Sequence, residues 1–392
     1  MKPPRALVPA ALLAALLVFE MGAILLAARV RGVDLAFVIP HFFGLDYYDF
    51  WQASRCLLDG QSPYAVERYV TPPLPALANL PLALLPLDRA ILAVAVANPV
   101  VVLLSCGLTA ASFFGPRRRE ATAVLALTAV LVATSYPFYF LLDRGNIDGF
   151  VLLLLCLAVV LAERRGILAG VCLGLAIGAK VYPLLLVLPL ALQRRWRALA
   201  ATGVCLALMG AAFPLGFWRD FGARLAERSG YFAIQENGSL SCTFFYLGVG
   251  LHEGFGVPFR PGVWHGAAWL VYGLLLGLCV WADHAKRSRR DVPAQRAAAL
   301  LYLPFMVAVP RTAFHYGLVL LLPLVPVLCW LWRERTGRGA RRALAWLVLG
   351  VALSQSQAVA LERLFGSVVP HVVPGAGLLL VLVGCTWLKL RT

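Results

Sequence analysis

The sequence has few charged residues. They make up 14% of its 392 residues, whereas 61% of the residues are hydrophobic. Such a composition cannot supply the polar surface of an ordinary water-soluble protein. Acidic residues are especially scarce, with 19 of them against 35 lysines and arginines. The composition therefore excludes a typical soluble protein and predicts an integral membrane protein that crosses the bilayer several times.

The sequence also lacks the short motifs that bind nucleotides or metals. It contains no P-loop, no G-x-G-x-x-G, no H-E-x-x-H and no D-x-D. ATP-driven transport, nucleotide binding and metal-dependent chemistry on nucleotide sugars are therefore unsupported. The nine cysteines form no C-x-x-C pair, so no metal or redox centre is predicted. We expect neither metal nor cofactor, and an enzyme of this kind would need an activated donor carried in the membrane.

Long apolar runs recur along the whole chain. Examples cover residues 6–28, 90–114, 121–142, 262–282 and 343–361. Each is close to the ~20 residues that a helix needs to cross a bilayer. Because they leave no room for a separate soluble domain, we predict a single all-α membrane domain over residues 1–392.

The basic residues lie in short clusters between the apolar runs, which indicates membrane topology and not nucleic-acid binding. With the N-terminus in the cytoplasm, all clusters fall on the inner side, as the positive-inside rule requires. They occupy residues 116–120, 163–166, 193–197, 284–290 and 333–342 and the C-terminal tail. Residues 166–193 must then enter and return on one side, although they are too few for two full spans. Since Pro183 breaks a helix, we predict two half-helices that meet near residues 179–183.

The opposite face receives most of the remaining polar residues, in loops at 29–89, 143–149, 217–261, 310–316 and 362–371. Irregular backbone is not tolerated in hydrocarbon, so these loops must lie at the interface or line an outward cavity. Apolar residues at helical spacing within 46–59 predict an interfacial helix with aromatic anchors. The prolines of 69–86 predict a second, broken interfacial piece. Function should therefore be sought on this face.

Two carboxylates stand at the start of the predicted interfacial helix. Asp46 and Asp49 are three residues apart and share one face if the stretch is helical. At the mouth of a cavity, one of them could take the proton of an acceptor hydroxyl as a general base. Alternatively, both are solvated acids or partners of Arg55 and Arg68, and spacing alone favours this alternative.

Cationic side chains suggest an anion site. Lys180 lies at a helix break within an apolar segment, where a charge is unfavourable unless it meets a polar cavity or a counter-charge. It could contact an anionic headgroup, or it could snorkel to the interface. Arg311 and His315 precede a predicted span and could hold a phosphate, although an ordinary interfacial histidine is equally compatible with the pattern.

Two further loops add polar side chains to the same face. They are RGNID at 144–148 and QENGSLS at 235–241. Their amides and charged groups, which include Arg144, Asn146, Asp148 and Asn237, suit hydrogen bonds to sugar hydroxyls. They also suit ordinary turns.

In their order along the chain, these stretches resemble glycosyltransferase family 87, membrane mannosyltransferase-like enzymes of the glycosyltransferase C superfamily. The first motif consists of Asp46, Phe50-Trp51, Ala53-Ser54, Leu57-Leu58, Gly60 and Pro63-Tyr64, followed by Tyr69, Pro72-Pro73 and Leu74. The later motifs are RGNIDG, the glycine-rich stretch ending in Lys180, Tyr182 and Pro183, the element NGSL from Asn237 to Leu240, and His315. The resemblance extends from residue 44 to residue 330, although a Ser-Pro and a Trp often found before the histidine are missing.

The resemblance implies a helical bundle of the glycosyltransferase C type, with about 10–12 membrane helices and interfacial helices in the first outer loop. It implies that Asp46 is the catalytic base, with Asp49 as its substitute. The donor phosphate would be bound by His315, Lys180 and Arg311. The residues expected to bind substrate are Tyr64, Arg144, Asn146, Tyr182 and Asn237.

The reaction implied is an inverting, metal-independent transfer of a sugar, most simply mannose, from a polyprenyl phosphate to a lipid-linked or glycan acceptor. It would take place on the outer face of a bacterial inner membrane, among membrane lipids. The rival class is a multi-pass transporter or lipid flippase, because broken helices occur in transporters too. Against it, no inverted repeat is visible and the polar residues gather on one face. The enzyme reading requires Asp46, Lys180 and His315 to surround one outward cavity.

Overall fold

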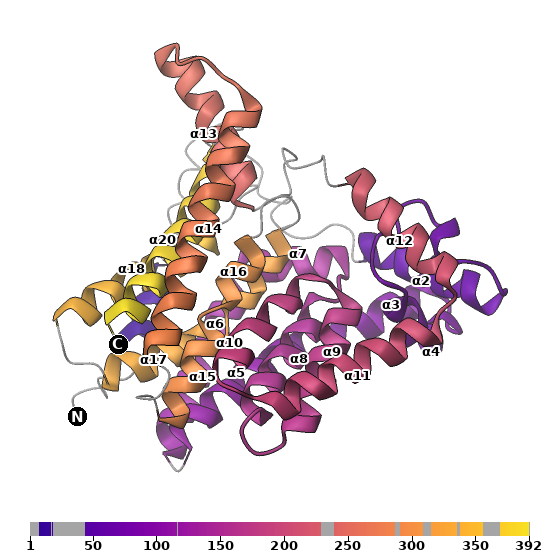
Figure 1. Ribbon diagram of the computed structural model, residues 1–392, viewed down its shortest axis with the longest axis horizontal. Helices are drawn as coiled ribbons and strands as arrows, with labels where there is room; N and C mark the ends of the chain where they lie inside the picture. The colour runs from indigo at the N-terminus through magenta and orange to yellow at the C-terminus, as the bar shows by residue number, and fades with distance from the viewer. Residues whose placement is uncertain are drawn as a thin grey trace. The chain divides into compact units, whose positions relative to one another are not determined.

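The computed structural model describes residues 8–16, 18, 44–115, 117–228, 239–286, 291–308, 315–334, 338–355 and 369–391. Every regular element among these residues is a helix, which confirms the all-α prediction (Figure 1). The chain divides into two compact units. The first contains Met1–Ile39, Cys106–Tyr139 and Tyr231–Thr392, and the second contains Pro40–Ser105 and Phe140–Gly230. The single domain predicted over 1–392 stays a prediction, and each unit is described by itself.

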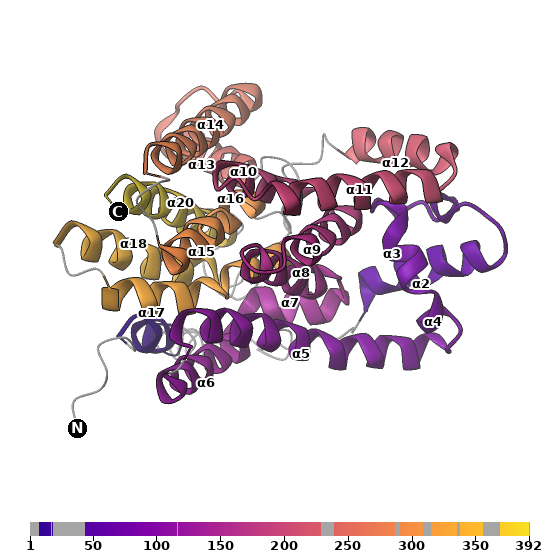
Figure 2. The ribbon, with the colours of Figure 1, turned by 60° about the horizontal axis from the view of Figure 1, so that its bottom comes forward.

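The second unit begins with the predicted interfacial helix. It is α2 (Leu45–Leu58), which ends at Asp59 before Gly60 turns the chain with a φ of 71°. A short turn, η3 (Pro63–Ala65), follows. The proline-rich stretch is broken as predicted, into α3 (Pro73–Ala78) and α4 (Leu80–Ala83). The predicted helix and the predicted break are both present, while their place at the membrane interface stays a prediction. Figure 2 shows the three helices lying together.

An aromatic and amide core fastens α2 to α3 and α4. Tyr47 is buried, and its hydroxyl donates to Asn79 Oδ1 over 2.8 Å. Asn79 Nδ2 in turn donates to Ser54 Oγ over 3.1 Å. Because each polar atom here is paired, the core holds the N-terminal turn of α2 in a fixed place without an unsatisfied group.

Two adjacent helices of this unit pack closely against each other at glycine residues. Once per turn, a glycine of α9 (Gly166–Ala179) faces α11 (Trp196–Ala212): Gly166, Gly170, Gly174 and Gly178. A methyl group on Gly170 would lie 2.2 Å from the Ala198 carbonyl oxygen, and one on Gly178 would lie 2.6 Å from Met209 Sδ. Thr202 Oγ1 donates to the Gly170 carbonyl over 3.1 Å. Small residues and a cross-helix hydroxyl bond are typical of close packing in membranes.

The same contacts show that α9 and α11 run parallel and begin at the same end, because positions advance together along both helices. Between them the chain must therefore return. It does so through η4 (Tyr182–Leu186) and α10 (Val187–Leu192), after α9 ends at Lys180 with extended backbone. The predicted pair of half-helices meeting near residues 179–183 is thus confirmed.

The rest of the second unit consists of the first part of α5 (Leu87–Phe114), the end of α7 (Tyr136–Arg144), α8 (Asp148–Leu161) and α12 (Leu215–Arg228). α12 packs against the α2–α3 region, where the rings of Phe217 and Phe221 each lie 6.5 Å from that of Tyr64. This packing buries Tyr64, which is 5% exposed.

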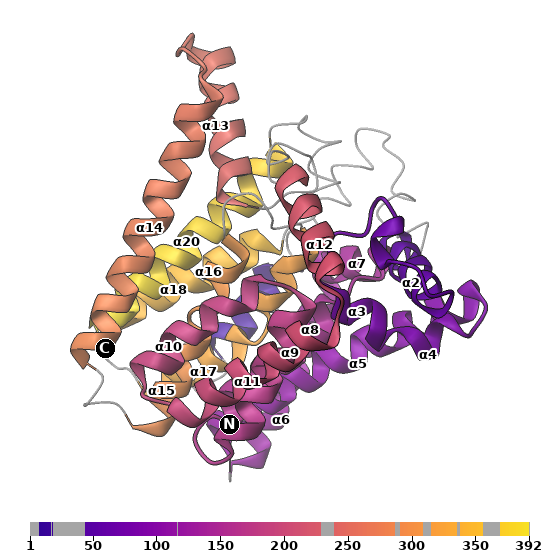
Figure 3. The same cartoon turned by 45° about the vertical axis from the view of Figure 1, so that its right-hand side comes forward.

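The first unit contains the end of α5, α6 (Arg118–Thr134) and the start of α7. It continues with α13 (Leu240–Phe255), α14 (Pro261–Lys286), α15 (Val292–Leu300), α16 (Leu303–Ala308), η6 (His315–Leu321), α17 (Leu324–Glu334), α18 (Arg338–Ser354) and α20 (Val369–Arg391). α18 and α20 pack closely, since a methyl group on Gly350 would lie 2.7 Å from the Gly377 carbonyl oxygen. Figure 3 shows α14, α18 and α20 side by side.

Basic clusters that were predicted to share one side of the membrane meet in pairs within each unit. Arg333 forms an ion pair with Glu120. Lys286 Nζ donates to the carbonyl of Leu390 over 2.6 Å, close to the C-terminal end of α20. In the second unit, Gly166 lies against Arg197. These neighbours support the predicted topology, while the side of the membrane on which they lie stays a prediction.

Three described helices are long and apolar enough to cross a membrane: Leu87–Phe114, Pro261–Lys286 and Gly317–Glu334. The number rises to five if two bent pairs each count as one span. The runs predicted at 90–114 and 262–282 are among the three. The first predicted run, 6–28, lies largely outside the described residues, and the total of 10–12 crossings stays a prediction.

The run at 121–142, predicted as one span, is in fact bent by 63° between α6 and α7. Ser135 has extended backbone, and its hydroxyl accepts the N–H of Phe138 over 3.3 Å, so it caps a new helix. Pro137 suits the first turn of that helix, where its missing N–H has no intrahelical partner. A serine cap followed by proline thus interrupts an otherwise continuous apolar run.

Candidate functional site

The first turn of α2 is packed against the turn that precedes α8. Gly44 N donates to the Asp143 carbonyl over 2.8 Å. Gly145 has a φ of 62°, and a methyl group there would lie 2.9 Å from Gly44 Cα and 2.7 Å from Tyr47 Cβ. Only glycine fits this conformation and this approach. Two segments a hundred residues apart in sequence are therefore in direct contact at the start of α2.

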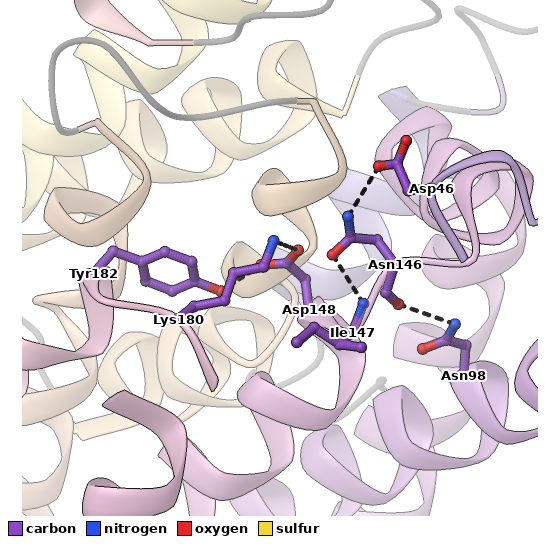
Figure 4. Close-up of polar contacts among 7 residues, drawn as sticks. All are labelled: Asp46, Asn98, Asn146, Ile147, Asp148, Lys180 and Tyr182. Carbon is purple, nitrogen blue, oxygen red and sulfur yellow. Dashed lines mark hydrogen bonds and ion pairs between the residues drawn. The ribbon is translucent and has the colours of Figure 1, made fainter. Parts of the chain in front are cut away.

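At this contact the carboxylate of Asp46 accepts one hydrogen bond and lies beside one cation. Asn146 Nδ2 donates to Asp46 Oδ2 over 3.0 Å (Figure 4), and Arg144 Nη1 lies 3.6 Å from Asp46 Oδ1. Both interactions stabilise the ionised carboxylate, which is the form that a general base requires. The Asp46 side chain keeps 29% of its surface exposed. It is therefore held in place and still open to a reactant.

Asn146 is itself held on both sides. Its Oδ1 accepts the N–H of Ile147 over 2.8 Å, and its carbonyl accepts a bond from Asn98 Nδ2 over 3.2 Å. Asn98 is fully buried on α5 and Asn146 is nearly so. The side-chain amide that points at Asp46 is consequently oriented by the Ile147 N–H, while a buried donor from α5 holds the backbone of the same residue.

Two residues further along, Asp148 begins α8 and receives two other groups. Lys180 Nζ lies 2.7 Å from Asp148 Oδ2, and the hydroxyl of Tyr182 donates to Asp148 Oδ1 (Figure 4). The Asp148 side chain is 1% exposed and that of Lys180 is 14% exposed. Asp148 is therefore the counter-charge that Lys180 needs in an apolar setting. This ion pair replaces the alternative in which Lys180 only snorkels to the interface.

Residues 144–148, hereafter the RGNID segment, thus connect two polar groups. Its first half, Arg144 and Asn146, holds Asp46 from the first loop. Its last residue, Asp148, holds Lys180 and Tyr182 from the break between the half-helices. Most of these residues are predicted from the sequence to share one face of the membrane, and the structure brings them to one segment.

Two other predicted site residues, Asp49 and Tyr64, lie in the α2–η3 part of the second unit. Asp49 lies on α2, three residues after Asp46, and is partly exposed. Tyr64 is in the core described above, where its hydroxyl donates to the Thr71 carbonyl over 2.8 Å. Burial raises the pKa of Tyr64 well above its ordinary value, so this hydroxyl stays protonated. Its expected contact with substrate stays a prediction.

Three predicted residues lie outside what the structure describes. Arg311 and Asn237 are outside the described residues, and His315 begins η6 with a side chain that is likewise outside them. The expected meeting of Asp46, Lys180 and His315 around one outward cavity therefore stays a prediction, although Asp46 and Lys180 both contact the RGNID segment.

Sequence reasoning missed the roles of Asp148 and Asn98. It gave Asp148 only a general role in binding sugars, although a carboxylate at the start of an apolar helix is itself a signal that a partner is near. Asn98, an amide in the middle of an apolar run, carried the same signal. Among the described residues, no group of three or more His, Cys, Asp or Glu side chains is arranged to hold a metal ion.

Apolar helices of membrane-spanning length and a partly exposed carboxylate held by an amide and a guanidinium define a membrane protein with a site suited to acid–base chemistry. A family model described as Glycosyltransferase family 87 matches residues 69–310, more than half of the chain. The chain therefore belongs to glycosyltransferase family 87. The match contains the RGNID segment, Lys180 and Tyr182, whereas Asp46 precedes it and His315 follows it. No curated protein matches the chain.

Proposed function

We propose that this glycosyltransferase moves a sugar, most simply mannose, from a polyprenyl-phosphate donor to a lipid-linked or glycan acceptor on the outer face of the membrane. The proposal rests on the position and the partial exposure of the Asp46 carboxylate. Its carboxylate is oriented by Asn146 and Arg144 and is still partly exposed. A positioned, accessible carboxylate is what abstraction of a hydroxyl proton needs.

In the proposed reaction the acceptor hydroxyl gives its proton to Asp46 while its oxygen attacks the anomeric carbon. The bond between that carbon and the phosphate oxygen breaks, and the electron pair leaves with the polyprenyl phosphate. Attack opposite the leaving group inverts the anomeric centre. No step of this scheme requires a metal ion.

The leaving phosphate gains negative charge as the bond breaks, so cationic groups at that oxygen accelerate the reaction. Lys180, Arg311 and His315 are the proposed source. Of these, Lys180 is described together with its partner, Asp148. Membership of a glycosyltransferase family weighs against the transporter alternative, whose main indication was the broken helix at Lys180.

The test uses the full chain, purified and reconstituted in lipid nanodiscs, with a polyprenyl-phosphate mannose. Release of polyprenyl phosphate should occur only when a glycan or lipid-linked acceptor is present. Asp46→Asn should lower the rate of release by roughly a hundredfold or more if Asp46 is the general base. Asp59→Asn, an exposed acid at the end of the same helix, is the matched control and should leave the rate unchanged.

The variants also decide between the two acids. If Asp49→Asn loses activity and Asp46→Asn retains it, the base is Asp49. Normal turnover by both variants would exclude a base in this helix. Helical circular dichroism and thermal unfolding of every variant ensure that lost turnover is not lost folding.

A further inference from the structure

Asp148 is a buried acid with no role in the reaction proposed above. Its side chain is 1% exposed, and its two oxygens are engaged by different groups, the Lys180 ammonium at 2.7 Å and the Tyr182 hydroxyl. Removing an ion from water is unfavourable unless a partner compensates it. The Asp148 carboxylate thus depends on Lys180.

The Lys180 side chain is less enclosed than that of Asp148, with exposed fractions of 14% and 1%. Part of the lysine side chain therefore reaches solvent, while the carboxylate that it pairs with is buried. Lys180 also ends α9, where the backbone turns into η4, and a long lysine side chain at such a break has many possible rotamers. Its bond to Asp148 selects one of them.

We propose that Asp148 is a positioning residue that acts on sugar transfer through Lys180 and Tyr182. It fixes the ammonium and the hydroxyl at the point where they meet the donor phosphate. Because Asp148 lies two residues after Asn146, the same short segment positions both the Lys180 ammonium and the Asp46 carboxylate (Figure 4). This inference rests on the proposed function, since it needs a donor phosphate at Lys180.

The structure offers a control pair of the same chemistry in the other compact unit. In the first unit, Lys389 Nζ lies 2.5 Å from Asp283 Oδ2, with side chains 1% and 6% exposed. Lys389 also donates to the Ala298 carbonyl over 2.9 Å and lies over the Tyr302 ring, 3.7 Å from its centroid. This pair joins α20 to α14 and α15, and we assign it no part in the reaction.

The experiment compares Asp148→Asn, Lys180→Met and the double variant with Asp283→Asn, Lys389→Met and their double variant. Each is measured for thermal stability, donor KM and kcat in nanodiscs. A lysine-to-methionine change leaves a buried carboxylate unpaired, so both single variants should unfold more readily. Each double variant should regain most of that stability.

Activity should separate the two pairs. Lys389→Met with Asp283→Asn should regain wild-type turnover together with stability. Lys180→Met with Asp148→Asn should regain stability while its kcat/KM stays roughly ten- to a hundredfold below wild type, the range lost with a charge-assisted bond. Asp148→Asn alone should raise the donor KM, and in the Lys180→Met background it should add little further loss.

Recovery of activity in the Lys180→Met and Asp148→Asn double variant would overturn the inference, since the pair would then be a structural brace only. Additive losses from the two changes would also overturn it, because Asp148 would not be acting through Lys180. If the wild-type protein releases no polyprenyl phosphate from any donor and acceptor, the proposed function fails first. That result appears in the wild-type arm and cannot be confused with the other two.

Discussion

The glycine interface between α9 and α11 allows a quantitative test by one methyl group. Gly170→Ala would place a Cβ 2.2 Å from the Ala198 carbonyl oxygen and 2.6 Å from Ala201 Cβ. Non-bonded carbon contacts favour separations of roughly 3.5–4.0 Å. Since the nearest atom belongs to the backbone, no side-chain rotation relieves the clash, and the helices must move apart by roughly 1 Å.

Two effects determine the expected magnitude. Overpacking of this kind costs about 1–3 kcal/mol, and the Thr202 bond to the Gly170 carbonyl, now 3.1 Å, would lengthen and lose up to about 1 kcal/mol. Against this, alanine is favoured over glycine within a helix by about 1 kcal/mol. If the Thr202 bond is lost completely, these two smaller effects cancel, and we expect a net loss of about 1–3 kcal/mol in the free energy of unfolding.

Gly203→Ala on α11 is the matched control. A methyl group at Gly203 meets nothing within 4 Å, so only the helix preference acts, and the variant should be about 0.5–1 kcal/mol more stable. Both proteins can be unfolded with a denaturing detergent and followed by helical circular dichroism. Gly170→Ala should also lose turnover, because α9 ends at Lys180. Equal stability of the two variants would refute the close, parallel packing of these helices.

Three further predictions concern other contacts. Lys389→Leu should lower the free energy of unfolding by about 3–5 kcal/mol because it strands Asp283, whereas Lys389→Leu with Asp283→Leu should lie near wild type; an unaffected melting temperature in the single variant would contradict the buried pair. Asn98→Ala removes the donor to the Asn146 carbonyl, and should cost about 1–3 kcal/mol and slow sugar transfer, while Ser112→Ala on the same helix serves as a control for both measurements. Burial raises the pKa of Tyr47 to about 12, so folding favours the protonated phenol. The resulting contribution of Tyr47 to the free energy of unfolding is complete below about pH 10 and is lost as the pH rises toward 12. Tyr47→Phe should flatten that alkaline decline in a pH series of unfolding curves, and an unchanged slope would exclude Tyr47 as its cause.

The sequence predicted features that are governed by local rules. The helix α2, the broken stretch at 69–86 and the return of the chain at Pro183 all follow from periodicity and from proline chemistry, and the structure contains each of them. The break at Ser135 was a local signal as well, a serine cap followed by Pro137, but the apolar composition around it concealed the signal.

The partners of the polar residues were not predictable in the same way. From the sequence, the candidate partners of Asp46 were Arg55 and Arg68, which are near it in the chain. In the structure, Asp46 instead contacts Arg144 and Asn146, about a hundred positions away. That choice depends on Gly44 and Gly145, whose close approach brings the two segments together. Tertiary packing sets such contacts, and a single sequence contains no direct measure of them.

The charges around the RGNID segment bear on what else the site needs. Arg144 lies 3.6 Å from Asp46 and 3.9 Å from Asp143, and Lys180 pairs with Asp148, so these three acids and two bases together carry a net charge of −1. The cluster therefore has no positive charge in excess of its own carboxylates. A leaving phosphate that gains charge, however, requires net positive potential. In the proposed reaction that positive charge must come from outside these five residues, which gives Arg311 and His315 a reason to be needed besides Lys180.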